Sequence, residues 1–156
     1  MRRAFTGWLL ALALTWAAVI AAEPLFRALA FDLRSVIVTK NEACPEPLCI
    51  VVDRVIQRDI ELVWWVTAHR SDTGGKVYGT PVSGAGPYTR AAYEANPVLH
   101  RSLAWWIGGQ SRLDDAALEP GRRYFIRTCH ALPPLNWPRG CAESNVFTVA
   151  AIEGGE

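Results

Sequence analysis

The stretch IELVWWVTAHR, residues 60–70, alternates between two kinds of side chain along its length. Its even-numbered positions are apolar as far as Ala68, whereas the odd-numbered positions include Glu61, Thr67 and His69. A period of two residues is typical of a strand with one buried face. Residues 60–70 are therefore predicted to form a strand.

Shorter stretches on both sides of residues 60–70 also have the character of strands. The predicted strands are 35–40, 49–56, 98–107, 122–130 and 144–152. The Gly- and Pro-rich connection at 71–97 is expected to hold a short strand at 76–80 and a helical turn near 89–95. Many short strands and few helical patterns predict an all-β antiparallel sandwich or barrel over residues 35–156.

The N-terminus has the pattern of a membrane anchor. Arg2 and Arg3 precede an uncharged run at 4–22, which as a helix spans roughly 28 Å, close to the apolar thickness of a bilayer. The two arginines favour a cytoplasmic N-terminus, a single crossing through residues 4–22 and an extracytoplasmic domain. The alternative is a signal peptide cleaved after Ala21-Ala22, which leaves the domain in the same compartment.

Residues 1–34 are accordingly assigned to the anchor, or signal peptide, and to a juxtamembrane helix. Apolar side chains at Leu25, Phe26, Leu29 and Leu33 are close to helical spacing. They predict that residues 25–34 extend the helix or lie along the membrane surface. A plain connector is the alternative.

The four cysteines all follow the apolar run. An even number of cysteines beyond an export signal is typical of disulfides formed in an oxidising compartment. The local pairing, Cys44–Cys49 and Cys129–Cys141, is favoured among the three pairings because each pair brackets a turn-rich segment. Neither spacing supplies the close ligand pair of a zinc site, so neither a metal nor another cofactor is expected.

The segment LEPGRRY, residues 118–124, resembles the Leu-x-Pro-Gly-x-x-Tyr corner of fibronectin type III domains, which are immunoglobulin-like β-sandwiches. The resemblance implies a turn at Pro120-Gly121 that leads into the sixth strand. It also implies that Tyr124 packs inward while its hydroxyl bonds back to the corner backbone. An ordinary proline-glycine turn ahead of a strand is the alternative interpretation.

The same resemblance makes residues 144–152 the last strand, paired as a hairpin with 122–130. The chain departs from the family in its long connection and its two expected disulfides. Cys129 lies five residues after Tyr124, so an inter-sheet disulfide of the antibody type is not implied.

The loop CHALPPLNWPRGC, residues 129–141, is a candidate binding site. A disulfide would close the loop and prolines would stiffen it, so binding would cost little further entropy. Tryptophan is also strongly enriched at binding hot spots. The candidate partner-binding residues of the loop are Pro133, Pro134, Leu135 and Trp137. The alternative is that Trp137 packs over the end of the sandwich.

Two pairs of adjacent tryptophans are the second candidate. Neighbours in a strand point to opposite faces, which assigns Trp64 and Trp105 to the core and makes Trp65 and Trp106 outward, partner-binding residues. If their strands are antiparallel neighbours, with Trp64 opposite Trp105, the outward face forms one patch: Trp65, Thr67, His69, His100, Ser102 and Trp106. Such a patch could stack on sugar rings, contact a protein or lie beneath the 71–97 connection. The two histidines lack the third ligand that a metal site needs.

Charge and motifs argue against several classes of function. With 16 basic residues, 15 acidic residues and no basic stripe, the chain lacks the footprint of a nucleic-acid binder. It contains no hydrolase, metalloprotease or phosphate-loop motif, and the adjacent Asp114-Asp115 pair does not converge on a substrate without special geometry.

The expected function is that of a membrane-tethered extracytoplasmic module that binds a protein partner of the cell envelope. The expected location is a bacterial inner membrane with the domain in the periplasm, or secretion if the N-terminal segment is cleaved. One alternative is a carbohydrate- or peptidoglycan-binding module that uses outward tryptophans, with a glycan as its partner. The other is a small envelope hydrolase.

Overall fold

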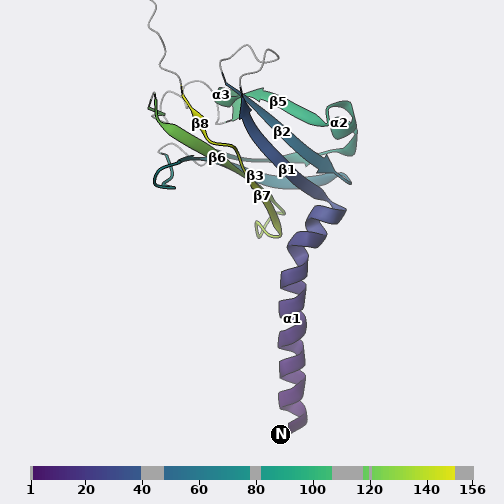
Figure 1. Cartoon of the computed structure of the whole chain (residues 1–156). Helices are drawn as coiled ribbons and strands as arrows, with labels where there is room; N and C mark the ends of the chain where they lie inside the picture. Colours follow the sequence, from purple (N-terminus) through teal and green to yellow (C-terminus); the bar gives the residue numbers. More distant parts are fainter. Residues whose placement is uncertain (1, 40–47, 78–81, 107–117, 120, 150–156) are drawn as a thin grey trace, which may run out of the picture.

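The computed structural model describes residues 2–39, 48–77, 82–106, 118–119 and 121–149. An N-terminal apolar helix is followed by two antiparallel sheets, which confirms the coarse architecture that the sequence predicts (Figure 1). Several predicted features lie outside the described residues: Cys44, Asp114, Asp115, Pro120 and the ends of the predicted strands 76–80, 98–107 and 144–152.

Helix α1, Arg2–Leu29, projects from one end of the sheets (Figure 1). Its segment Gly7–Leu29 is long and apolar enough to cross a membrane, and almost all of it is exposed. The helix ends at Leu29, and the first strand begins at Phe31 rather than at residue 35. Phe26 and Phe31 are both buried, with ring centroids 6.4 Å apart, so the end of the helix is packed onto the core of the domain.

The first sheet has the order β1–β2–β5. Its strands are β1, Phe31–Thr39, β2, Cys49–Ile56, and β5, Val98–Ser102. The bounds of β2 are those predicted from its β-branched residues. Thr39 pairs with Cys49 at one end of the β1–β2 hairpin, and Phe31 pairs with Ile56 at the other.

The second sheet has the order β4–β3–β6–β7, with β8 also paired to β6. Its strands are β3, Ile60–Arg70, β4, Val82–Tyr88, β6, Arg123–Ala131, β7, Arg139–Glu143, and β8, Phe147–Thr148. The structure confirms the predicted bounds of β3. Its even-numbered residues Leu62 and Val66 are fully buried, as the alternation requires.

The two sheets enclose one core and are linked along one side. Val36 of β1 forms a bridge to Ser144. The side-chain oxygen of Asn145 accepts a hydrogen bond from the Val38 backbone N–H at 2.7 Å, and its amide nitrogen donates to the Val38 carbonyl at 2.9 Å. The edge strands β4 and β5 belong to different sheets and are connected through helix α2, Arg90–Ala95. The predicted helical turn near 89–95 is thus confirmed, with Thr89 as its N-cap.

The predicted pairing of the two tryptophan-containing strands is wrong. β3 lies between β4 and β6, whereas β5 pairs with β2 in the other sheet, so Trp64 does not oppose Trp105. Residues 103–106 form the short helix α3, Leu103–Trp106, because the Ser102 hydroxyl accepts a hydrogen bond from the Trp105 backbone N–H and caps a helical turn. Period two no longer applies there. Trp105 is 55% exposed and Trp106 only 8%, the reverse of the prediction.

The predicted last hairpin is also wrong in part. The hairpin partner of β6 is β7, a strand whose sequence RGCAE has no apolar alternation. The predicted strand at 144–152 is represented by β8, which pairs with only the first residues of β6.

The corner before β6 has the expected hydrogen bond. Tyr124 is fully buried, and its hydroxyl accepts from the Glu119 backbone N–H at 2.8 Å. Gly121 has a φ of 80°, a left-handed conformation that favours glycine. The local geometry inferred from the fibronectin-like motif is therefore present among the described residues of the corner.

Candidate functional site

A cleft of about 590 Å³ lies between the two sheets on the side of their edge strands β4 and β5. Its walls come from both sheets and from α3: Val52, Arg54, Leu99, Trp64, Val66, Tyr88, Thr128, His130, Trp105 and Trp106. Most of these side chains are apolar or aromatic, and only a few polar groups join them. Such a combination is typical of small-molecule binding sites, which use apolar walls for contact and a few polar groups for orientation.

The strand register gives the cleft a polar end and an apolar end. His130 pairs with Trp64, and two residues away along the same strands Thr128 pairs with Val66. Tyr88 lies at the His130 end, with its ring centroid 5.3 Å from that of the imidazole. Arg54 is close enough to both rings to affect their pKa values.

Arg54 is a half-buried cation that has no counterion in the described part of the chain. None of the ion pairs among the described residues includes it. Its Nη2 donates a long hydrogen bond, 3.5 Å, to the Asn96 carbonyl, and its buried Nη1 has no partner among the described residues. Desolvation by burial lowers the pKa of Arg54, but a guanidinium keeps its proton in proteins.

His130 is a second polar group at this end, and it is only 4% exposed. Burial, with a smaller effect from the positive charge of Arg54, lowers the pKa of His130 to about 3, so the ring is neutral at pH 7. Its Nε2 lies 3.1 Å from the Tyr88 hydroxyl, while no described residue provides a partner for its Nδ1. Burial also raises the pKa of Tyr88 to about 12, so the phenol remains protonated.

The aromatic walls are held in place by close contacts. Trp64 lies against Gly84, the residue opposite it on β4, and a Cβ at Gly84 would come within 2.7 Å of the indole Cζ2. Trp106 is fixed by a hydrogen bond of 3.1 Å that its Nε1 donates to the Thr128 hydroxyl. The indole N–H of Trp106 is therefore satisfied, and its ring contributes apolar surface to the cleft.

The sequence contains a signal for this site that the tryptophan pairs do not provide, namely polar residues at core-facing strand positions. Along β2, the even-numbered residues Ile50, Val52 and Ile56 are buried, and Arg54 is the even-numbered residue between the last two. Along β6, His130 follows Tyr124, Ile126 and Thr128 in the same way. Polar residues at core-facing positions are unusual and mark a site that needs them.

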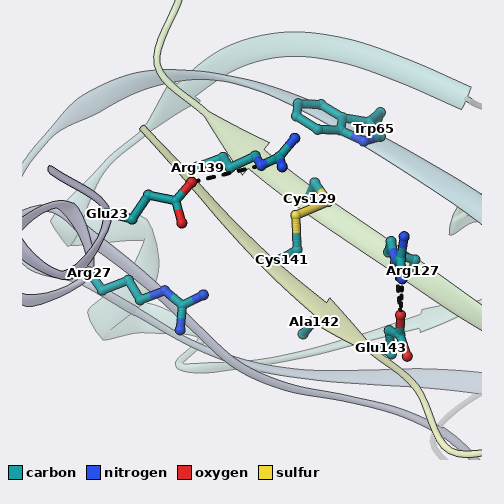
Figure 2. A pocket seen from close by; sticks show the side chains of 9 residues that line it. All are labelled: Glu23, Arg27, Trp65, Arg127, Cys129, Arg139, Cys141, Ala142 and Glu143. Carbon is teal, nitrogen blue, oxygen red and sulfur yellow. Dashed lines mark hydrogen bonds and ion pairs between the residues drawn. A yellow bond between two sulfur atoms is a disulfide. The ribbon is translucent and has the colours of Figure 1, made fainter. Parts of the chain in front are cut away.

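A second, shallower pocket of about 480 Å³ lies between the end of α1 and the outer face of the second sheet (Figure 2). In this pocket Arg139 of β7 lies 3.8 Å from Glu23 of α1, and Arg127 pairs with Glu143. Figure 2 shows Arg27 turned toward the pocket, and it takes part in no ion pair among the described residues. The pocket is lined by residues of both α1 and the β6–β7 hairpin, and the contact between Glu23 and Arg139 connects the two elements.

The hairpin loop holds four of the predicted binding residues. Pro133, Pro134 and Leu135 are exposed, and Leu135 at 79% is among the most exposed apolar side chains of the protein. Trp137 is partly exposed. The loop projects on the same side of the domain as α1 (Figure 1).

The other predicted binding residues do not lie on one surface. Trp65 is half-buried and lines the pocket beside α1, whereas Trp106 lines the inter-sheet cleft. Thr67 and His69 are buried on the outer face of β3, where the imidazole stacks on Phe125 and lies 3.0 Å from the Gly74 carbonyl. Part of the surface that buries them is the turn after β3, which includes Gly74. The six residues of the predicted patch therefore do not form one exposed surface.

The structure confirms the Cys129–Cys141 disulfide, which joins directly paired residues of β6 and β7. Cys49 is also disulfide-bonded and fully buried. Its predicted partner Cys44 lies outside the described residues.

Comparison with known proteins leaves the fold without an assigned family. No protein-family model matches the chain, and no curated protein is similar to it.

Proposed function

We propose that this chain is a membrane-tethered, extracytoplasmic binding module that contacts a protein partner in the cell envelope. In this proposal α1 crosses a bacterial inner membrane once, with its N-terminus in the cytoplasm and the domain in the periplasm. The exposed apolar surface of Gly7–Leu29 supports the crossing. The Cys129–Cys141 disulfide supports the oxidising compartment, because such bonds are rare in the cytosol.

The domain itself is proposed to be an immunoglobulin-like sandwich of the fibronectin type III kind. In immunoglobulin-like sandwiches strands A, B and E share one sheet, and C, F and G share the other. The orders β1–β2–β5 and β4–β3–β6–β7 agree with this if β1, β2 and β3 are A, B and C, and β5, β6 and β7 are E, F and G. The Tyr124 hydrogen bond then stands where a tyrosine corner is expected, at the start of F.

One observation carries the choice of contact surface: an exposed apolar loop, closed by a disulfide, lies beside the helix that we propose to be in the membrane. Phe26 packs near Gly140, and Glu23 approaches Arg139, so β7 is attached to the end of α1. A partner that reached Leu135 would therefore be close to the membrane surface. We propose that it is a membrane protein that contacts both the hairpin loop and α1.

A photo-crosslinking residue at Leu135, with the full chain in its own membrane, tests this contact. We expect one protein adduct of defined mass that is absent when the photo-crosslinking residue replaces Thr73. Thr73 is exposed, like Leu135, but lies at the other end of the second sheet. It follows Arg70, which pairs with Tyr124 at the end of β6 farthest from the hairpin loop.

A tryptophan pair provides the second control. Truncation at a binding hot spot costs about 2 kcal/mol, or about 30-fold in affinity, so Trp137→Ala should remove most of the adduct. Trp105→Ala removes an exposed tryptophan from α3 and should leave the adduct unchanged. Adducts with lipid alone, or the same protein adduct from position 73, would overturn the proposed contact.

A further inference from the structure

The polar end of the inter-sheet cleft contains a positive charge, that of Arg54, which no described residue neutralises. Arg54 occupies a core-facing position of β2, and its buried Nη1 lacks a hydrogen-bond acceptor within the described ranges. Leaving a buried charged group unpaired opposes folding, and native proteins normally pair such groups or assign them to a function. Arg101, the nearby charge that adds to the lowering of the Arg54 pKa, has the same sign and offers no compensation.

We propose that the cleft between the two sheets binds an amphipathic monoanion, with its carboxylate on Arg54 and its apolar body between Trp64 and Trp106. A carboxylate can accept two parallel hydrogen bonds from one guanidinium, which is among the strongest polar contacts in proteins. It would supply the negative charge that no described residue provides to Arg54. The proposed site is separate from the hairpin loop, so either proposal can fail while the other stands.

The register of the strands orients this ligand. Arg54, Tyr88 and His130 form the polar end, and Val52, two residues along β2 from Arg54, begins the apolar end. There Leu99, which pairs with Val52, adds aliphatic surface. The carboxylate is therefore expected near His130, with the apolar body directed toward Trp106.

The chemistry of the walls argues against cations and sugars as ligands. A cation would be repelled by Arg54, and a sugar would need more hydrogen-bonding groups than this cleft contains. The cleft volume of about 590 Å³ lies within the range of about 300–1,000 Å³ that is usual for small-molecule sites. An aromatic or aliphatic carboxylate satisfies both the single charge and the large apolar area.

Calorimetric titration with a pair of matched probes tests the proposal. The full chain in lipid nanodiscs is titrated with 2-naphthylacetate and with its neutral isostere 2-naphthylacetamide, and empty nanodiscs give the partitioning blank. Both probes fill the apolar end equally, but only the acid can make a charge-assisted contact with Arg54. We expect the acid to bind at least about tenfold more tightly than the amide.

Two pairs of variants locate the binding. Arg54→Gln should weaken the acid about tenfold and leave the amide unchanged, whereas Arg58→Gln, at an exposed position after β2, should affect neither probe. Leu99→Trp should fill the cleft and abolish binding of both probes. Val98→Trp places the same side chain at an exposed neighbour on β5 and should preserve both affinities.

Thermal unfolding of each variant shows whether it is folded, so loss of binding can be separated from loss of structure. Equal affinities of acid and amide would overturn the proposal. It would also be overturned by an unchanged acid affinity in Arg54→Gln, by full binding in a folded Leu99→Trp variant, or by no binding of either probe to the wild-type chain.

Discussion

Arg54 and His130 occupy positions where an apolar side chain would give a more stable core. Each has one buried nitrogen without a hydrogen-bond partner in the part of the chain that the structure describes, and a buried unsatisfied group costs about 1–3 kcal/mol. Both lie at the same end of one cleft. A third such nitrogen, Nε of Arg70, belongs to a residue that does not line this cleft, so the shared location of Arg54 and His130, and not the missing bonds alone, supports the proposed site.

His130 should make the stability of the domain depend on pH. Its pKa is lowered by burial to about 3 in the folded chain, against the 6.5 that is usual for histidine, so the unfolded chain binds a proton first as the pH falls. The contribution of the neutral His130 ring to stability is therefore fully present above pH 6.5 and is lost as the pH falls toward 3. As the pH is lowered, we expect the free energy of unfolding to decrease more steeply in wild type than in His130→Gln. The difference between the two slopes should reach up to about 1.4 kcal/mol per pH unit.

Urea denaturation followed by circular dichroism, repeated from pH 8 to pH 4, measures this difference. Glutamine at position 130 can still bond to the Tyr88 hydroxyl but does not titrate, so the carboxylates contribute equally to both curves. Parallel curves for the two proteins over this range would show that His130 is not buried as a neutral ring.

The pairing of β3 with β4 depends on the absence of a side chain at Gly84. A Cβ there would lie 2.7 Å from the Trp64 indole, whereas one at Gly86 on the same strand would meet no atom within 4 Å. Gly84→Ala should therefore lower the free energy of unfolding by about 1–3 kcal/mol, through displacement of Trp64 toward the cleft. Gly86→Ala should change it little or raise it by about 0.4–1 kcal/mol.

The two alanine variants are compared by chemical denaturation, with tryptophan fluorescence as a reporter of the Trp64 environment. Equal stabilities would mean that Gly84 is not needed for space. They would also remove the physical explanation for the position of the Trp64 wall of the cleft.

The alternating pattern predicted some strands well and hid others. β3 has the predicted bounds because its apolar residues follow the period of a half-buried strand, and β2 has them because its sequence is rich in β-branched residues. The pattern does not predict β4, because VSGAGPY has the composition of a turn. The need for a glycine at position 84 becomes clear only from the strand register, which places Trp64 opposite it. The helix α3 could not be inferred from its sequence, since VLHRSLAWWI continues the alternation beyond the Ser102 cap.

The candidate site was harder to predict than the strands. Local sequence suggested that Trp65 and Trp106 share a surface, but which strands are neighbours is decided by long-range pairing, and β5 joins β2. Arg54 and His130 are 76 positions apart in the sequence. Only the packing of the two sheets brings these two residues into one cleft.

The molecule as a whole has its helix and its exposed hairpin loop at the same end. α1 runs into β1 with only Ala30 between them, and β7 contacts the last turns of the helix through Gly140 and Arg139. This arrangement limits the freedom of the domain relative to α1. A membrane around the helix would therefore face the hairpin loop rather than the opposite end of the sheets (Figure 1).

The location of the chain relative to a membrane is the most direct test of the account. Cells that produce the full chain are converted to spheroplasts, exposed to an external protease, and fractionated with an alkaline carbonate wash. The account predicts that the intact chain stays in the washed membrane pellet and that the protease removes the domain from unbroken spheroplasts. Recovery of the chain in the soluble fraction, or full protection of the domain until the spheroplasts are lysed, would contradict it.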